Sequence, residues 1–320
     1  MESLHVPEEL LSFAHELADV SGEKIRPYFR NSAVVHTKDS HTEYPDVVTE
    51  ADLSAEKAMR ELIEQRYPTH GILGEEFGSV RLESDWVWVL DPVDGTRDFA
   101  TGTLTWGTLI GLCFRSAPVL GVIDQPIVGD RWLGAHGHPT TYNGKKLTYA
   151  HDGDVPSSLA ESRSVVSGAG FGALGDAGYI SAATALVAAV RTTSFTVNAY
   201  TYGLLALGSI ELAFEAPGAG DCIVICSLQF FVPSGGTVLT RRRVSATDAQ
   251  AYDICAVIPV VEGVGGSVCH TGKQYSVTTT EFASCFFPGS PAPTRFTSLG
   301  ARGQDATRMH PKVLVSTESN

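Results

Sequence analysis

The chain has 320 residues, 43% of them hydrophobic and 18% charged, and its formal net charge at pH 7 is −13. This length and composition allow a large buried core, in one large domain or two coupled lobes, and they exclude a disordered or fibrous protein. The negative charge argues against nucleic acid or an anionic membrane as a partner, because both favour a basic surface.

The N-terminus and the cysteines indicate a cellular compartment. Residues 1–20 carry acids and lack the basic and apolar regions of a secretory signal, and no run reaches the length of a membrane-spanning helix. The six cysteines are scattered rather than set out as a disulfide framework, so we expect a cytoplasmic protein. Cys222, Cys226 and His270 raise the alternative of a zinc site, but the segment CIVIC is apolar and favours buried thiols.

Two helices are expected in the first 70 residues. Apolar residues spaced by three or four predict a helix over 8–30. Thr49 and Asp52 have the spacing of a capping box, which predicts a second helix that begins near Thr49. This helix is expected to stop near Tyr67, because the next residue is a proline. In this interpretation Asp52 serves the helix N-terminus.

The rest of the chain mixes strands and helices without an internal repeat. The expected elements are strands at 86–90, 106–114, 118–126 and 131–135, and helices near 182–190, near 202–208 and toward Gly263. The second and third of these strands are joined by a short connection at Arg115 and Ser116. The pattern is that of a mixed α and β protein.

Paired carboxylates follow the first of these strands. Pro92 fixes φ and lacks an N–H, so it helps to end the strand, while Gly95 permits the tight or positive-φ geometry of a turn. Such a turn directs Asp91, Asp94 and the Val93 carbonyl to one point. Without a counter-charge the carboxylates would repel each other, and a hard divalent cation such as Mg²⁺ removes that cost.

Other acids and two amides extend this group. Glu75 and Asp253 supply further oxygen ligands, and the amides of Gly95 and Thr96 are placed to hold phosphate oxygens, so the pattern indicates phosphate chemistry. Each feature alone has a simpler interpretation, with DPVDG as an ordinary turn, Glu75 as a surface acid and Asp253 as a partner of a helix N-terminus. The combination favours the metal site.

Four blocks, in this order, resemble the signatures of the inositol monophosphatase family of Mg²⁺-dependent, lithium-sensitive phosphatases. They are DVVTEAD at 46–52, GEE at 74–76, WVLDPVDGTRDF at 88–99 and YDICAVIPVVEGVGG at 252–266. Within the family, the stretches WGTLIGLCFRSAPVLGVIDQPIVGDRWLG and AYTYGLLALGSIELAFE are most similar to the histidinol-phosphatase branch.

The resemblance implies a fold and a division into lobes. The fold class is α/β, a layered α/β/α/β/α sandwich of the inositol monophosphatase and sugar phosphatase type. The site is expected between an N-terminal lobe, 1–150, and a C-terminal lobe, 151–270, with an atypical tail at 271–320.

The resemblance also implies how Mg²⁺ binds. One ion is held by Glu75, Asp91 and the Val93 carbonyl. A second is held by Asp91, Asp94 and Asp253, so that Asp91 bridges the two ions, and a third, weaker ion binds through Glu75. Two such ions stabilise both the attacking and the leaving oxygen of an in-line displacement.

Catalytic and substrate-binding residues follow from the same resemblance. The nucleophilic water is implied to lie next to the Asp46 carboxylate and the Thr96 hydroxyl, with Glu75 orienting it. The implied substrate contacts are Gly95, Thr96, Asn198, Glu211 and Glu215.

The implied activity is hydrolysis of a small phosphate monoester by two-metal activation of water. L-histidinol phosphate is the expected substrate, giving L-histidinol and phosphate in histidine biosynthesis, and Glu211 and Glu215 suit its cationic amine. Inositol monophosphate is the alternative substrate. A catalytically silent member with a structural or regulatory role is the alternative of another class. Because members of the family are commonly dimers, a homodimer is expected.

The chain departs from the family pattern at two places. Asn198, in TVNAY, replaces an acid of the histidinol-phosphatase branch that reads the substrate. The path from Glu215 to Asp253 is roughly 31 residues longer than in the family, which is long for an unstructured loop. Three interpretations of the insert at about 217–250 stay open: an arginine lid that reaches phosphate, a surface insertion, or a retained intron or gene-model error. The tail, rich in Ser, Thr, Pro and Gly, is expected to be disordered or mistranslated.

Overall fold

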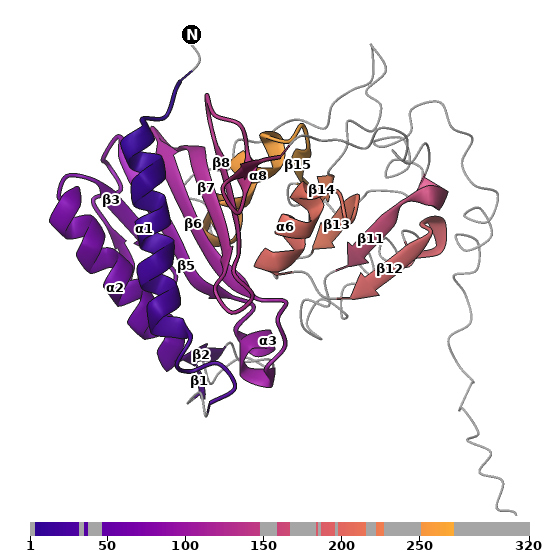
Figure 1. The fold of residues 1–320 in the computed structure, drawn as a ribbon, viewed down its shortest axis with the longest axis horizontal. Helices are drawn as coiled ribbons and strands as arrows, with labels where there is room; N and C mark the ends of the chain where they lie inside the picture. Colours follow the sequence, from indigo (N-terminus) through magenta and orange to yellow (C-terminus); the bar gives the residue numbers. More distant parts are fainter. Residues whose placement is uncertain are drawn as a thin grey trace, which may run out of the picture.

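Two β-sheets with helices between them organise the chain (Figure 1). The structure, a computed structural model, describes residues 4–31, 35–37, 47–147, 159–166, 184, 187–195, 198–215, 222–226 and 251–271. Asp46, part of the helix expected near 182–190, most of the insert and the tail beyond Thr271 lie outside the described residues.

The larger sheet has eight strands in the order β10-β9-β8-β7-β6-β5-β3-β4. Their bounds are β3 Gly71–Gly74, β4 Gly78–Val80, β5 Trp86–Asp94, β6 Gly107–Phe114, β7 Ala117–Gln125, β8 Asp130–Ala135, β9 Thr141–Tyr142 and β10 Lys145–Lys146. Neighbouring strands are antiparallel except β3 and β5, which are parallel.

The smaller sheet has five strands in the order β12-β11-β13-β14-β15. Their bounds are β11 Arg163–Val166, β12 Thr192–Phe195, β13 Leu212–Glu215, β14 Cys222–Cys226 and β15 Ser267–Thr271. A separate pair consists of β1 Val35–Thr37 and β2 Val47–Thr49, and β2 leads directly into the second helix.

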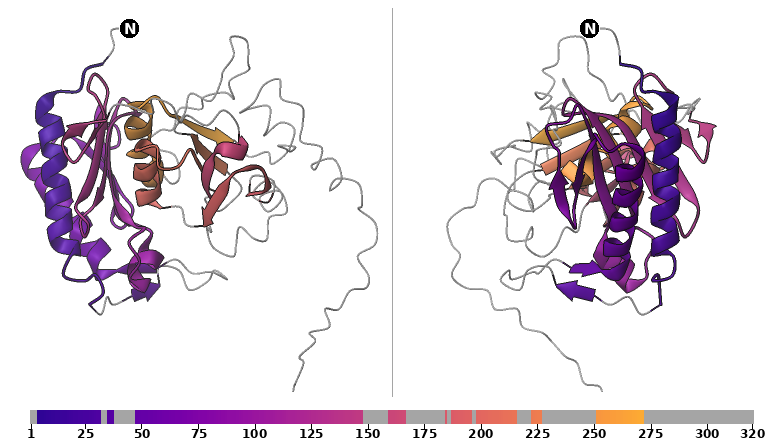
Figure 2. Two further views of the ribbon diagram at one scale, coloured as in Figure 1. Left: turned by 45° about the vertical axis from the view of Figure 1, so that its right-hand side comes forward. Right: turned by 90° about the vertical axis from the view of Figure 1, so that its left-hand side faces the viewer.

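Helices cover both faces of the larger sheet, which places a core on each side (Figure 2). Their bounds are α1 Glu8–Ile25, α2 Glu50–Arg66, α3 Thr96–Thr101, η1 Leu159–Glu161, α6 Ala199–Ala206, α7 Ala251–Ile254 and α8 Val257–Glu262. On one face Phe13 and Met59 of α1 and α2 pack with Trp88. On the other, Tyr202 and Val257 of α6 and α8 pack with the sheet. The described residues therefore form a layered α/β/α/β arrangement, in agreement with the expected fold class.

The two N-terminal helices form where the sequence predicts them. α1 ends at Ile25 rather than near residue 30, since Pro27 disfavours helix just before it, and the chain then turns, with a φ of 56° at Arg30. α2 begins after Thr49, and the predicted capping box is present, with the Asp52 side chain bound to the Thr49 backbone N–H. Both helices bury one face against the sheet.

The predicted connection at Arg115 and Ser116 joins β6 and β7 as a hairpin. Both residues have positive φ, 48° and 65°, which is the geometry that matches the twist of paired strands. A loop of two residues fixes the register of the hairpin. The centre of the larger sheet is therefore set by local contacts.

The helix expected to run toward Gly263 is instead split into α7 and α8. Pro259 explains the break, because its ring lacks an N–H and would clash with the carbonyl of Cys255 in a continuous helix. In α8 the proline lies in the first turn, where its N–H is not needed. The helix ends at Glu262, with Gly263 as its cap residue, as expected.

Part of the insert belongs to the smaller sheet. β14 pairs antiparallel with β13 on one side and with β15 on the other. The backbone of residues 222–226 therefore forms an internal strand, and the three interpretations of the insert as a whole stay open. The side chains of Cys222, Cys226 and His270, which bear on the zinc alternative, lie outside the description. No helix within the described ranges is long and apolar enough to cross a membrane.

Candidate active site

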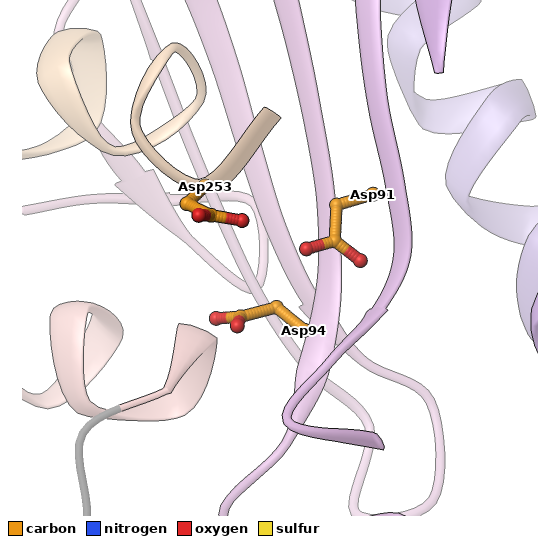
Figure 3. Close-up of side chains that lie close together, drawn as sticks. All are labelled: Asp91, Asp94 and Asp253. Atoms are coloured by element: carbon orange, nitrogen blue, oxygen red, sulfur yellow. The ribbon is translucent and has the colours of Figure 1, made fainter. Parts of the chain in front are cut away.

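The end of β5 brings Asp91 and Asp94 to one side of the strand. The strand was predicted to end near Pro92, but it continues to Asp94. Its register against β6 shifts between the two aspartates. In a regular strand, residues three apart point to opposite faces, and an irregularity of this kind re-aims one of them. Figure 3 shows the two carboxylates facing a common point. The turn itself begins at Gly95.

Asp253 completes this group from α7 (Figure 3). One carboxylate oxygen from each of Asp91, Asp94 and Asp253 lies within 4.8 Å of the others. The junction of α7 and α8 rests on β7 at Gly121, where a Cβ would lie 1.8 Å from the Ala256 carbonyl oxygen. Only glycine allows this approach, so a backbone position on β7 determines how deeply α7 carries Asp253 into the site.

The charges of the cluster are unfavourable without a cation. Burial raises the pKa of Asp91 well above its ordinary value, and the nearby negative charges of Glu75, Asp94 and Asp253 raise this pKa further. Asp91 is 1% exposed, and its Oδ1 has no hydrogen-bond partner among the described residues. An all-oxygen donor set with a buried, unsatisfied carboxylate oxygen fits a hard divalent cation such as Mg²⁺.

Glu75 is held close to this group by a buried acid that the sequence did not single out. Glu56, on α2, is fully buried and accepts hydrogen bonds from the backbone N–H of Glu76 at 2.7 Å and of Phe77 at 3.1 Å. Arg60 donates to the same carboxylate at 2.7 Å. These bonds fix the backbone that carries Glu75, whose charge acts on Asp91 and Asp52. Glu56 is therefore a structural anchor for a candidate ligand.

Asp52 lies closer to the reacting centre than its capping role predicts. The Thr96 hydroxyl is 3.3 Å from Asp52 Oδ1 and 3.1 Å from the Val93 carbonyl oxygen. Burial raises the pKa of Asp52 to about 6, although hydrogen bonds from Thr49 oppose this effect. The signal in the sequence was an acid on the buried stripe of α2, next to Ala51. Asp46, the acid expected in this role, lies outside the described residues.

Gly95 and Thr96 form the start of α3. Gly95 is the N-cap residue with φ 94°, a left-handed conformation that favours glycine, and α3 begins at Thr96. A Cβ on Gly95 would lie 2.7 Å from the Asn198 Nδ2 atom. Asn198 is the N-cap residue of α6, so this contact joins the expected phosphate loop to the C-terminal half.

The two glutamates expected to contact substrate lie on or beside β13. Glu211 is 2% exposed, and its carboxylate accepts from the backbone N–H of Arg163 at 2.5 Å and pairs with the guanidinium of the same residue. A carboxylate engaged in this way holds β11 and β13 together. Glu215 is the last residue of β13, and its side chain lies outside the description.

Comparisons with known proteins give a consistent result. The model of the inositol monophosphatase family matches residues 6–285. A histidinol-phosphatase of Chlorobaculum parvum is 37% identical over 261 residues, which cover 80% of this chain and 83% of the relative. The bifunctional phosphatase IMPL2 of Arabidopsis thaliana is 34% identical over 262 residues, 81% of this chain but 64% of that longer protein.

A solved structure of an inositol monophosphatase from Zymomonas mobilis has the same fold. It is 32% identical, the superposition covers 82% of this chain and 85% of the other, and the TM-score is 0.60. These relatives are phosphoric monoester hydrolases by name, and the acidic cluster fits the metal dependence of the family. The chain belongs to the inositol monophosphatase family and is a phosphomonoester hydrolase.

Proposed function

We propose that this protein is a Mg²⁺-dependent phosphatase that hydrolyses L-histidinol phosphate to L-histidinol and phosphate. The observation that carries the proposal is the carboxylate cluster of Asp91, Asp94 and Asp253, in which Asp91 is buried, has a raised pKa and keeps one oxygen without a hydrogen-bond partner among the described residues. Without a cation such a cluster is destabilised by charge repulsion or has to keep a proton, and a bound cation removes that cost. Glu75 and the Val93 carbonyl complete the proposed ligand set. When bound there, two ions and a weaker third supply charge neutralisation and water activation.

The chain's own groups handle the proton in this proposal. When the Thr96 hydroxyl donates to Asp52, its lone pairs are left to accept a hydrogen bond from the attacking water. Asp52 is then the carboxylate that takes up the proton. The amides of Gly95 and Thr96 hold phosphate oxygens at the start of α3. Asp52 thus replaces Asp46 as our candidate for the general base, with Thr96 as the relay.

The choice of L-histidinol phosphate is supported by the similarity to the Chlorobaculum parvum histidinol-phosphatase. Inositol monophosphate is the second candidate, because the Zymomonas mobilis inositol monophosphatase is 32% identical. The Arg163 pairing of Glu211 removes one of the two carboxylates expected to favour a cationic amine. Asn198, whose amide lies beside Gly95, is a neutral polar group next to the phosphate loop.

The test is phosphate release from both esters with Mg²⁺ and with EDTA. We expect EDTA to abolish release and Mg²⁺ to restore it, with kcat/KM higher for L-histidinol phosphate than for inositol 1-phosphate. Equal or better turnover of inositol 1-phosphate would overturn the substrate assignment alone. Absence of Mg²⁺-dependent release from either ester would favour a catalytically silent member.

A further inference from the structure

A hydrogen bond between two distant helix starts lies beside the proposed phosphate loop. Asn198 Nδ2 donates to Asp98 Oδ2 at 2.6 Å, across 100 residues of sequence. Asp98 lies in the first turn of α3, and Asn198 is the N-cap residue of α6. The bond thus connects the loop of Gly95 and Thr96 with the C-terminal half of the chain. The proposed mechanism uses neither side chain.

Asp98 is itself fixed by hydrogen bonds from nearby threonine hydroxyls at the end of α3 and just after it. The Thr105 hydroxyl donates to the same Oδ2 at 2.5 Å, and the Thr103 hydroxyl, which contacts Thr105 at 3.1 Å, donates to the Asp98 backbone carbonyl at 3.2 Å. Thr101 binds that carbonyl as well, at 3.1 Å. The Asp98 backbone is thus fixed by Thr101 and Thr103 and its carboxylate by Thr105, so Asn198 meets a positioned acceptor.

This acceptor determines which way the Asn198 amide faces. An ionised carboxylate only accepts hydrogen bonds, so the NH₂ group of Asn198 has to point at Asp98 and the carbonyl oxygen has to point elsewhere. Within the described part of the chain, no group donates to Asn198 Oδ1. Asn198 is also packed against Gly95, with its Nδ2 2.7 Å from where a Cβ on that glycine would lie. An oriented, available acceptor therefore lies beside the phosphate loop.

We propose that Asp98 is a positioning residue that fixes Asn198 so that its Oδ1 accepts a hydrogen bond from the organic part of the substrate. The inference rests on the proposed function. The substrate class it names is a phosphate monoester with a hydroxyl or ammonium donor near the ester. The negative charge stays on Asp98, which does not touch the substrate. The group that contacts the substrate is the neutral amide of Asn198, polarised by its hydrogen bond to Asp98. Such an acceptor binds both kinds of donor and discriminates weakly between them.

The test is a charge exchange between the two positions, measured with three substrates. These are L-histidinol phosphate, inositol 1-phosphate and p-nitrophenyl phosphate, which lacks a hydrogen-bond donor. Asp98→Ala should raise KM about tenfold for L-histidinol phosphate and inositol 1-phosphate, which carry hydrogen-bond donors, and should change kcat by less than about twofold. The KM for p-nitrophenyl phosphate should not change. Asp98→Asn is the milder variant and keeps the volume of the side chain. The Mg²⁺ concentration for half-activation should not change in either variant.

The two remaining variants separate positioning from folding. Asn198→Asp alone places two carboxylates at hydrogen-bond distance and should weaken both donor substrates. Combining it with Asp98→Asn restores the bond with donor and acceptor exchanged, and Thr105 can accept as well as donate. The charge then faces the substrate, so the ratio of kcat/KM for L-histidinol phosphate over inositol 1-phosphate should rise about tenfold above wild type.

The outcomes are distinguishable. Equal KM values in wild type and Asp98→Ala, or a double variant no better than Asn198→Asp, would overturn this inference while Mg²⁺-dependent hydrolysis by the wild type still stood. Equal losses on all three substrates would also overturn it, because they would indicate a general structural role. A wild type that released no phosphate from any of the three esters would overturn the proposed function and this inference together.

Discussion

The acids of the site come from two regions that are built differently. Asp91 and Asp94 lie on β5, a nine-residue strand paired along its length with β6. Asp253 lies on α7, a helix of four residues that packs against the middle of the larger sheet. The first pair is placed by one strand and its bulge, whereas Asp253 is placed by long-range packing. The comparison teaches that two of the three carboxylates are placed locally, whereas the third depends on how two distant parts of the chain meet.

Removing the central carboxylate should have the largest effect. Asp91→Asn takes a negative charge from the point where the two regions meet, and we expect activity to fall by several orders of magnitude while the fold persists. Phosphate release and circular dichroism measure the two effects. Asp85→Asn is the control, because Asp85 lies just before β5 in an exposed ion pair with Arg115, and its activity should be near wild type. Near-wild-type turnover by Asp91→Asn would contradict the metal assignment.

Displacing α7 should selectively disturb Asp253, the carboxylate placed by long-range packing. Gly121→Ala puts a methyl group 1.8 Å from the Ala256 carbonyl oxygen, so α7 and Asp253 have to shift. We expect a loss of about 1–3 kcal/mol in stability and a loss of activity larger than the remaining folded fraction explains. Gly129→Asn is the control, since a Cβ added at Gly129 would have no described atom within 4 Å and Asn tolerates positive φ. Full activity in folded Gly121→Ala would show that the position of α7 does not depend on the close contact at Gly121.

Loosening the Glu75 loop should have a smaller effect. Glu56→Gln weakens the acceptor for the Glu76 and Phe77 amides, so the Mg²⁺ concentration for half-maximal activity should rise about tenfold, with a smaller change in kcat. Glu64→Gln, on the exposed side of the same helix, is the matched control. If both variants showed the same Mg²⁺ titration, Glu56 would have no anchoring role.

The last prediction concerns the stability of the metal-free protein and has the smallest bearing on activity. The folded pKa of Asp91 is raised above its unfolded value, so the folded state retains a proton that the unfolded state releases. In EDTA, stability should therefore fall as pH rises from about 4 toward that raised pKa, by up to about 1.4 kcal/mol per pH unit. Asp91→Asn should remove part of this slope, because the other acids of the cluster remain. Thermal melts of wild type and Asp91→Asn in EDTA between pH 4 and 8 measure this. An equal dependence of stability on pH in the two proteins would argue against the coupled cluster.

Local features of the site and fold were predictable from the sequence. Helical spacing and the Thr49–Asp52 capping box located α1 and α2, and the two-residue connection at Arg115 located the β6–β7 hairpin. The closely spaced acids of DPVDG predicted two members of the cluster, Asp253 was expected as a further oxygen ligand, and the family resemblance assigned it to the same ion as Asp94. These features depend on residues within one or two turns of each other, or on short motifs whose chemistry is set by residue type.

Other features were decided only by tertiary structure. Asp52 is an ordinary cap in any local window, and it becomes a partner of Thr96 because α2 and α3 meet across 44 residues. The insert contains β14 because β13 and β15 provide hydrogen-bonding partners on both sides of it. The helices α7 and α8 are separate because Pro259 is buried and has to lie in the first turn of a helix. The Asp98–Asn198 bond likewise exists only where two helix starts converge. The sequence by itself determined which residues carry charge and which segments form helices and strands. Packing over long sequence distances decided which charges meet, since spacing and caps act locally while burial and electrostatic coupling depend on neighbours that no local pattern specifies.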